Sequence, residues 1–142
     1  MLCLTMKMKK IFLAYKFREQ NPLELRKKLE ELSKIIEEAT NYKTFIFFRD
    51  AQNWGEKKMD VKELVEKAFK AIKECDAILV EASEKARGVY FEVGCAKALN
   101  KKIIIIHKKG TEANFLEAAA DVSIEYEDLE DLRKKLGNLP SN

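Results

Sequence analysis

The chain has 142 residues, the length of one globular domain, and hydrophobic residues make up 46% of it, which excludes an intrinsically disordered protein. Charged residues make up 36%, yet 27 Lys and Arg nearly balance 24 Asp and Glu, so the charge gives no argument for binding duplex nucleic acid. Abundant ions beside a single His and few amide side chains are typical of heat-adapted proteins, and we interpret the source as thermophilic.

No stretch approaches the length of a membrane span, and the apolar piece within residues 1–8 is too short for a signal peptide. We interpret residues 1–8 as a mobile leader and residues 9–142 as a single domain. The three Cys lie in apolar surroundings without a C-x-x-C spacing, which predicts buried thiols in a reducing cytoplasm. With one His, the sequence predicts no metal site, and it indicates no cofactor.

Five short apolar runs alternate with helical patterns. The first four are apolar on both faces, as expected of strands covered on both sides, and the fifth alternates as an edge strand does. These runs are residues 11–15, 44–48, 77–80, 103–106 and 122–126.

The segments between these runs have a helical period. In the first helix apolar residues recur every three or four positions after Pro22, with Asn21 as its cap. The second helix, capped by Asp60, is expected to bury its apolar stripe. That stripe consists of Val61, Leu64, Val65, Ala68 and Ile72. A third helix over about 89–99 is expected to be well buried, followed by a short one over 114–119 and a last one that ends near Gly137.

Strict alternation of strands and helices predicts a three-layer flavodoxin-like (Rossmann-like) α/β fold. We expect a five-stranded parallel sheet of order 2-1-3-4-5 with helices on both faces. Ligands of such sheets bind beyond the carboxyl ends of the strands, near the point where the strand order reverses. No glycine-rich phosphate loop and no paired acids follow the first strand, which argues against a flavodoxin, a phospho-receiver or a dinucleotide site.

Glu92 is the leading catalytic candidate at that edge. We expect it in the opening turn of the third helix, where backbone N–H groups favour an ionised carboxylate. A carboxylate facing a sugar-sized hollow can attack an anomeric carbon that bears a good leaving group. The competing interpretation is a charge that only stabilises the helix.

The segments 75–83 (CDAILVEAS) and 88–103 (GVYFEVGCAKALNKKI) resemble the nucleoside 2-deoxyribosyltransferase family, including its 2'-deoxynucleoside 5'-phosphate N-hydrolase relatives. The resemblance implies that Glu92 is the nucleophile and forms a glycosyl-enzyme ester. It implies that Gly88 lets the loop approach the sugar, and that an aromatic residue on the first strand orients the nucleophile. Phe12 matches that position without a hydroxyl, while Tyr15 lies three residues further on.

The resemblance also implies a homodimer in which a polar residue near Asn114 reaches the neighbour's site. The sequence departs from the family at two polar positions, which are Ala68 and Ala86 here, and the first loop is bulky rather than glycine-rich. An acid lost at position 68 has three candidate substitutes. These are Asp50, Asp60 and Glu66.

Several side chains at the same edge suit a nucleotide. Lys16, Arg18 and Arg87 are predicted to converge on a phosphate, and Trp54 is predicted to stack on a base near Tyr15. Ordinary solvated charge is the alternative for the basic residues.

The sequence therefore predicts cleavage or transfer at the N-glycosidic bond of a (deoxy)nucleoside or its 5'-monophosphate. Hydrolase and transferase are left open, because both share the first half-reaction. The alternative is a nucleotide-binding module that kept the fold and lost turnover; a pure interaction domain is a third option. No nucleic-acid or membrane partner is expected.

Overall fold

The computed structural model describes residues 8–140, so all of the predicted leader except Met8 lies outside the described residues. Five parallel strands form one sheet of order β2-β1-β3-β4-β5, which confirms the predicted fold. The strands are β1 Lys9–Ala14, β2 Tyr42–Ile46, β3 Ala77–Glu81, β4 Lys102–Lys108 and β5 Val122–Tyr126.

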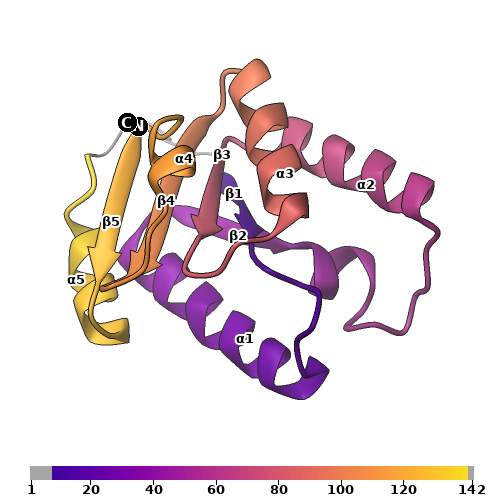
Figure 1. Ribbon diagram of the computed structural model, residues 1–142, viewed down its shortest axis with the longest axis horizontal. Helices are drawn as coiled ribbons and strands as arrows, with labels where there is room; N and C mark the ends of the chain where they lie inside the picture. The colour runs from indigo at the N-terminus through magenta and orange to yellow at the C-terminus, as the bar shows by residue number, and fades with distance from the viewer. Residues whose placement is uncertain (1–7, 141–142) are drawn as a thin grey trace, which may run out of the picture.

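Helices cover both faces of the sheet (Figure 1). One face carries α1 (Pro22–Ala39) and α5 (Leu129–Gly137), and the other carries α2 (Val61–Glu74), α3 (Arg87–Ala98) and the short α4 (Asn114–Glu117). No helix among residues 8–140 is long and apolar enough to cross a membrane.

The first helix follows its sequence pattern closely. The Asn21 side chain accepts hydrogen bonds from the backbone N–H groups of Leu23 and Glu24, at 3.0 and 3.1 Å, and Pro22 opens the first turn. The apolar stripe from Leu25 to Ile36 is buried against the sheet. The predicted cap and buried stripe of α1 are both confirmed.

The second strand ends earlier than predicted. Ile46 is its last residue, and Phe47–Ala51 form a π-helical turn, η1. The turn is stabilised because the Asp50 carboxylate accepts a hydrogen bond from the Ile46 N–H at 2.9 Å. The prediction of a strand through residue 48 is therefore wrong in its second half.

The outer edge of β2 is closed by the chain's own side chains. The N–H groups of Tyr42, Thr44 and Ile46 donate to Thr40 Oγ1, Glu37 Oε2 and Asp50 Oδ2, at 3.1, 2.9 and 2.9 Å. Natural proteins protect edge strands from pairing with other chains in ways of this kind. A neighbouring chain therefore finds no free ladder of donors along this edge.

The helices on the other face are less buried than predicted. Val61 is 72% exposed, and Leu64 and Val65 are 37% and 39% exposed, so the expectation of a buried stripe on α2 is wrong for these residues. Only the small or C-terminal residues Ala68, Ala71 and Ile72 of α2 are buried. On α3 Phe91 is 47% exposed, which corrects the expectation of a well-buried helix. No further layer covers these helices within residues 8–140.

Candidate active site

Glu92 lies in the second turn of α3 rather than in its opening turn. The helix begins at Arg87, two residues before the predicted start, and its first turn contains no acid. The helix-terminal N–H groups that stabilise a charge act within the first turn. The expected reason for an ionised carboxylate is therefore absent.

Burial has the opposite effect on this side chain. Glu92 is half-buried, and desolvation of the carboxyl group raises its pKa to about 8. The expectation of a low pKa is wrong. At pH 7 about one molecule in ten carries the ionised form that nucleophilic attack requires.

Tyr15, directly after β1, is the tyrosine whose titration the Glu92 charge affects. Its hydroxyl accepts a hydrogen bond from the Phe48 N–H at 3.1 Å. Burial raises the pKa of Tyr15, and the negative charges of Glu92 and Asp50 raise it further against that hydrogen bond. Tyr15 thus lies in the field of both carboxylates. Phe12, at the family's aromatic position, is fully buried in the core.

Position 68 holds Ala rather than the acid that the resemblance implies. Ala68 is 3% exposed and packs in α2. Of the three predicted substitutes, Asp60 caps α2 by accepting from the Glu63 N–H at 2.8 Å, and Glu66 is exposed on the same helix. Asp50 is the one whose charge acts on Tyr15. Its carboxylate also accepts two hydrogen bonds of 2.9 Å from the Arg49 guanidinium.

The loops after β1 and β3 meet, as predicted. Lys16 Nζ lies 3.5 Å from Glu84 Oε2, which joins the two loops. Arg18 and Arg87 are exposed. Ala86 precedes α3 without a side-chain cap, so the N–H groups of the first turn are left to solvent or a ligand.

Gly88 is exposed in that first turn of α3, and a Cβ added there would meet no atom within 4 Å. The space beside the Gly88 backbone is therefore open. This opening is compatible with the close approach of a sugar that the family resemblance implies, and Gly88 remains a predicted contact.

Trp54 packs toward α1. Its ring contacts Phe48 edge-on at 5.4 Å between centroids, and the Arg26 guanidinium lies 4.7 Å from the Trp54 ring centroid. Arg26 therefore occupies one face of the indole. The predicted base-stacking role needs the other face.

Asn114 is exposed as the first residue of α4. Its neighbour Phe115, 79% exposed, contacts Tyr90 of α3 at 5.8 Å between ring centroids. Asn114 thus lies beside apolar side chains on the α3 side of the sheet.

Sequence reasoning gave no role to Glu81, which ends β3 and is 4% exposed. Its carboxylate accepts hydrogen bonds from Ser83 N at 2.7 Å, from Ser83 Oγ at 3.1 Å and from the Tyr126 hydroxyl. An acid at the end of an otherwise apolar buried strand was the available signal.

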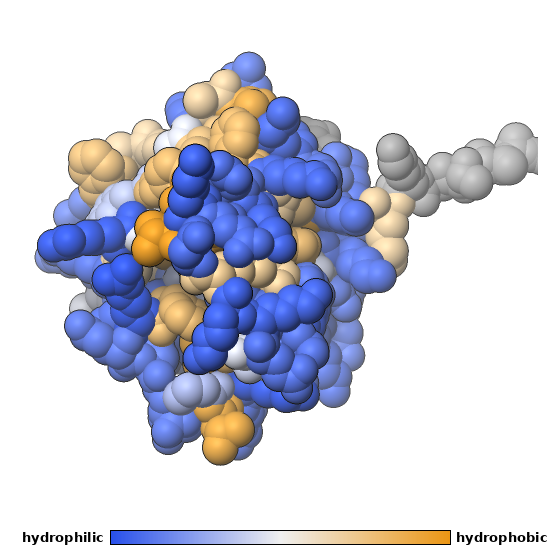
Figure 2. Space-filling view, turned by 90° about the vertical axis from the view of Figure 1, so that its right-hand side faces the viewer, coloured by the Kyte–Doolittle hydropathy of each residue, from blue (hydrophilic) through white to orange (hydrophobic). Residues whose placement is uncertain are grey.

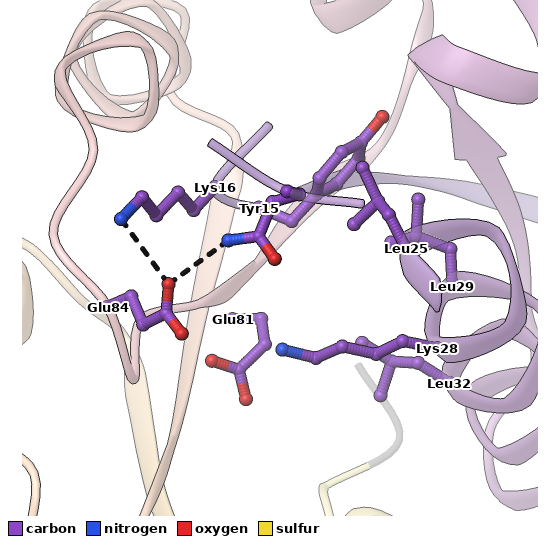
Figure 3. Close-up of a pocket in the computed structure, with 9 residues that line it drawn as sticks. Tyr15, Lys16, Leu25, Lys28, Leu29, Leu32, Glu81 and Glu84 are labelled. Carbon is purple, nitrogen blue, oxygen red and sulfur yellow. Dashed lines mark hydrogen bonds and ion pairs between the residues drawn. The ribbon is translucent and has the colours of Figure 1, made fainter. Parts of the chain in front are cut away.

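A small cavity lies beside the first loop, between α1 and the crest of the sheet (Figure 3). Tyr15, Lys16, Glu81 and Glu84 are among its lining residues, and Glu92 is not. Its volume of about 10 Å³ holds about one water molecule, so it is not the sugar-sized hollow expected at Glu92.

The fold and this edge define a doubly wound α/β protein with carboxyl groups gathered where the strand order reverses. A family model described as "Nucleoside 2-deoxyribosyltransferase" matches residues 7–132. The chain belongs to the nucleoside 2-deoxyribosyltransferase family.

Similar solved structures show the same fold. A CMP N-glycosidase of Clostridium botulinum, BcmB, is 24% identical with a TM-score of 0.64, over 90% of this chain and 98% of that chain. A 2-deoxyribosyltransferase of Bacillus psychrosaccharolyticus is 16% identical with a TM-score of 0.66, over 92% of each chain. A putative pilus assembly-related protein of Burkholderia pseudomallei is 9% identical with a TM-score of 0.53, over 95% of each chain. The fold alone therefore does not define the reaction. No curated protein sequence matches the chain.

Proposed function

We propose that the protein cleaves, or transfers at, the N-glycosidic bond of a (deoxy)nucleoside or nucleoside 5'-monophosphate, with Glu92 as the nucleophile. Family membership supports the reaction class. The observation that carries the residue assignment is the desolvated Glu92 carboxyl group, whose charge acts on the Tyr15 hydroxyl, at the edge where this sheet type binds ligands.

In the proposed reaction an ionised Glu92 oxygen attacks C1' of the sugar. The C1'–N bond breaks, its electron pair leaves with the base, and the base takes up a proton. Water then attacks C1' of the ester and loses a proton, while the bond from C1' to the Glu92 oxygen breaks, its electron pair returns to the carboxylate and the sugar is released; in a transferase a second base replaces water. In this proposal Tyr15, whose hydroxyl lies in the field of both Glu92 and Asp50, donates to the carboxylate once substrate is bound.

The basic loop residues supply the contacts for a phosphorylated substrate. Lys16, Arg18 and Arg87 follow β1 and β3, and the uncapped first turn of α3 begins at Arg87. Guanidinium groups and helix-terminal N–H groups both suit phosphate oxygens. Gly88 contacts the sugar and Trp54 stacks on the base in this proposal.

The direct test is release of free base from deoxynucleoside monophosphates and nucleosides, followed by chromatography. We expect release by the wild type and a sugar adduct on the peptide that contains Glu92, detected by mass spectrometry. A second base added to the reaction separates exchange from hydrolysis. Undiminished base release by Glu92→Ala would refute the nucleophile assignment.

The protein acts as a homodimer in this proposal. The surface that supports it, the helical apolar face, consists of exposed apolar side chains on α2, α3 and α4. Its residues are Val61, Leu64, Val65, Phe69, Phe91 and Phe115. Exposed apolar patches mark contact surfaces. Figure 2, which views the molecule from the end that carries α2, shows apolar side chains between charged ones.

Two further features fit a second copy of the chain as the occupant. The sequence of α2 has four Lys and three Glu, so two copies of this helix do not repel each other strongly. The β2 edge is closed to strand pairing, so a second copy gains no backbone hydrogen bonds from that edge of the sheet. Asn114, next to Phe115, would then lie near the neighbour's site.

Light scattering coupled to size exclusion tests the dimer. We expect a dimer for the wild type and a monomer for Val65→Glu, because a charge replaces an apolar contact. Leu23→Glu is the matched control, since Leu23 is 80% exposed on α1, on the other face of the sheet. A monomeric wild type, or equal effects of both substitutions, would contradict the proposal.

One observation favours a second function, a nucleotide-binding module without turnover. Ala68 and Ala86 provide no polar side chain where the family has one, and position 68 is buried. Nucleotide binding in a thermal-shift assay, with no base released over hours, would decide for this alternative.

A further inference from the structure

Glu84 links the two loops that meet at the carboxyl ends of β1 and β3. It follows β3, and its Oε2 atom lies 3.5 Å from Lys16 Nζ and accepts a hydrogen bond of 3.2 Å from Gln20 Nε2 (Figure 3). Lys16 and Gln20 both belong to the loop between β1 and α1. One oxygen of one carboxylate therefore receives an ammonium group and an amide from the loop opposite.

An ammonium group and an amide are also suitable donors for a phosphate oxygen. In the structure the chain's own carboxylate occupies that position. The neighbouring cavity takes about one water molecule, so this linked arrangement leaves no space for a ligand between the loops there.

The link is weak enough to exchange. The side chains of Lys16 and Glu84 are 27% and 53% exposed, and Glu19, the other acid near Lys16 at 3.8 Å, is 83% exposed. Exposed ion pairs of this kind contribute little to stability. A phosphate monoester carries more negative charge at pH 7 and three acceptor oxygens, so it competes well for the same donors.

We propose that Glu84 is an internal competitor for the anion site, and that the 5'-phosphate of a nucleoside monophosphate displaces it from Lys16 and Gln20. The exchange frees the loop between β1 and α1 to open. An uncharged nucleoside does not compete for these donors, so Glu84 lowers the affinity for monophosphates and leaves the affinity for nucleosides unchanged, while Lys16 supplies the preference for a phosphate. This inference rests on the proposed nucleotide substrate and names the residue that regulates binding of its phosphate.

Binding measured by calorimetry, apart from turnover, tests the exchange. The ligands are the four deoxynucleoside monophosphates, the matching nucleosides and inorganic phosphate. Glu84→Gln is expected to bind monophosphates and phosphate about 1.5- to fivefold more tightly, the range set by the loss of one exposed ion pair. Nucleoside affinity stays unchanged. Lys16→Met loses the preference for monophosphates, and adding Glu84→Gln to it restores nothing.

The matched control is Glu127→Gln, which removes a carboxylate that is paired with Lys109 at 3.1 Å and is 65% exposed, against 53% for Glu84. It is expected to leave all affinities unchanged. Thermal unfolding without ligand confirms that each variant is folded.

Three results would overturn the inference. They are unchanged phosphate affinity in Glu84→Gln, an equal gain for nucleosides, and no phosphate binding by any variant. Base release is assayed separately. If Glu84→Gln gains monophosphate affinity but the wild type releases no base, only the proposed catalysis is refuted. If base is released but Glu84→Gln gains no monophosphate affinity, only the displacement of Glu84 is refuted.

Discussion

Two carboxyl groups near the carboxyl ends of the strands differ in their hydrogen-bond donors. Glu81, on the α1 side, is buried and accepts three hydrogen bonds. Glu92, on the α3 side, has a pKa raised to about 8 by desolvation, and its carboxyl has no hydrogen-bond partner within residues 8–140. A buried acid that is held by donors is fixed and structural, whereas a half-buried acid without donors keeps its lone pairs available for chemistry.

The two helical layers differ in how much of their apolar surface is buried. The apolar stripe of α1 is buried against the sheet, while most of the corresponding stripe of α2 is exposed. Both helices are amphipathic in sequence, so periodicity reports an apolar face but not what covers it. One layer is complete in the single chain, and the other presents a contact surface.

The largest expected effect separates the two acids. Glu92→Gln is expected to lower base release at least about 10³-fold, because an amide cannot form the ester. Glu81→Gln keeps the reaction but lowers the midpoint of thermal unfolding, since one hydrogen bond to the carboxylate loses its acceptor. Single-turnover base release and thermal unfolding check this. A comparable rate loss in both variants would remove the distinction between the two acids.

The next effect separates the two helical layers. Leu29→Ala, at 1% exposure on α1, is expected to lower the free energy of unfolding by about 2–5 kcal/mol. Leu64→Ala, at 37% exposure on α2, is expected to cost less than about 1 kcal/mol in the monomer. Urea denaturation at low protein concentration measures both. Equal losses would show that α2 buries its stripe as α1 does.

The smallest effect concerns pH. Because the folded-state pKa of Glu92 is above its ordinary value, the unfolded state loses this proton first, and the contribution to stability falls between about pH 4.5 and pH 8. Glu92→Gln is expected to become more stable than the wild type by about 1–3 kcal/mol between pH 5 and pH 9, less than the full shift implies because of partial exposure. Parallel stability curves for the two proteins would contradict the raised pKa.

The same pKa predicts the rate profile. If the ionised carboxylate attacks, kcat/KM rises about tenfold per pH unit up to about pH 8 and then levels. A flat profile across this range would mean that another group is the nucleophile.

Sequence patterns predicted most of the fold. The five apolar runs, the caps Asn21 and Asp60 and the strict alternation led to the observed strand order. These features are local, because capping side chains and hydrophobic period act over a few residues. The end of β2 was missed, since the Asp50 side chain folds back on Ile46 and no periodicity encodes that contact.

The site was predicted only in outline. The motif around Glu92 was found through its resemblance to a known family, and the meeting of the loops after β1 and β3 followed from the parallel topology. The pKa of Glu92, the field at Tyr15 and the link from Glu84 to Gln20 did not, because each depends on neighbours far apart in the chain.

The sequence by itself determined which residues form strands and helices, and which loops meet at the carboxyl ends of the strands. The tertiary structure decided whether each acid at that edge is held by donors, desolvated or paired with a lysine. The reason is physical: secondary structure arises from short-range periodicity, while the free energy of a charge depends on everything packed around it.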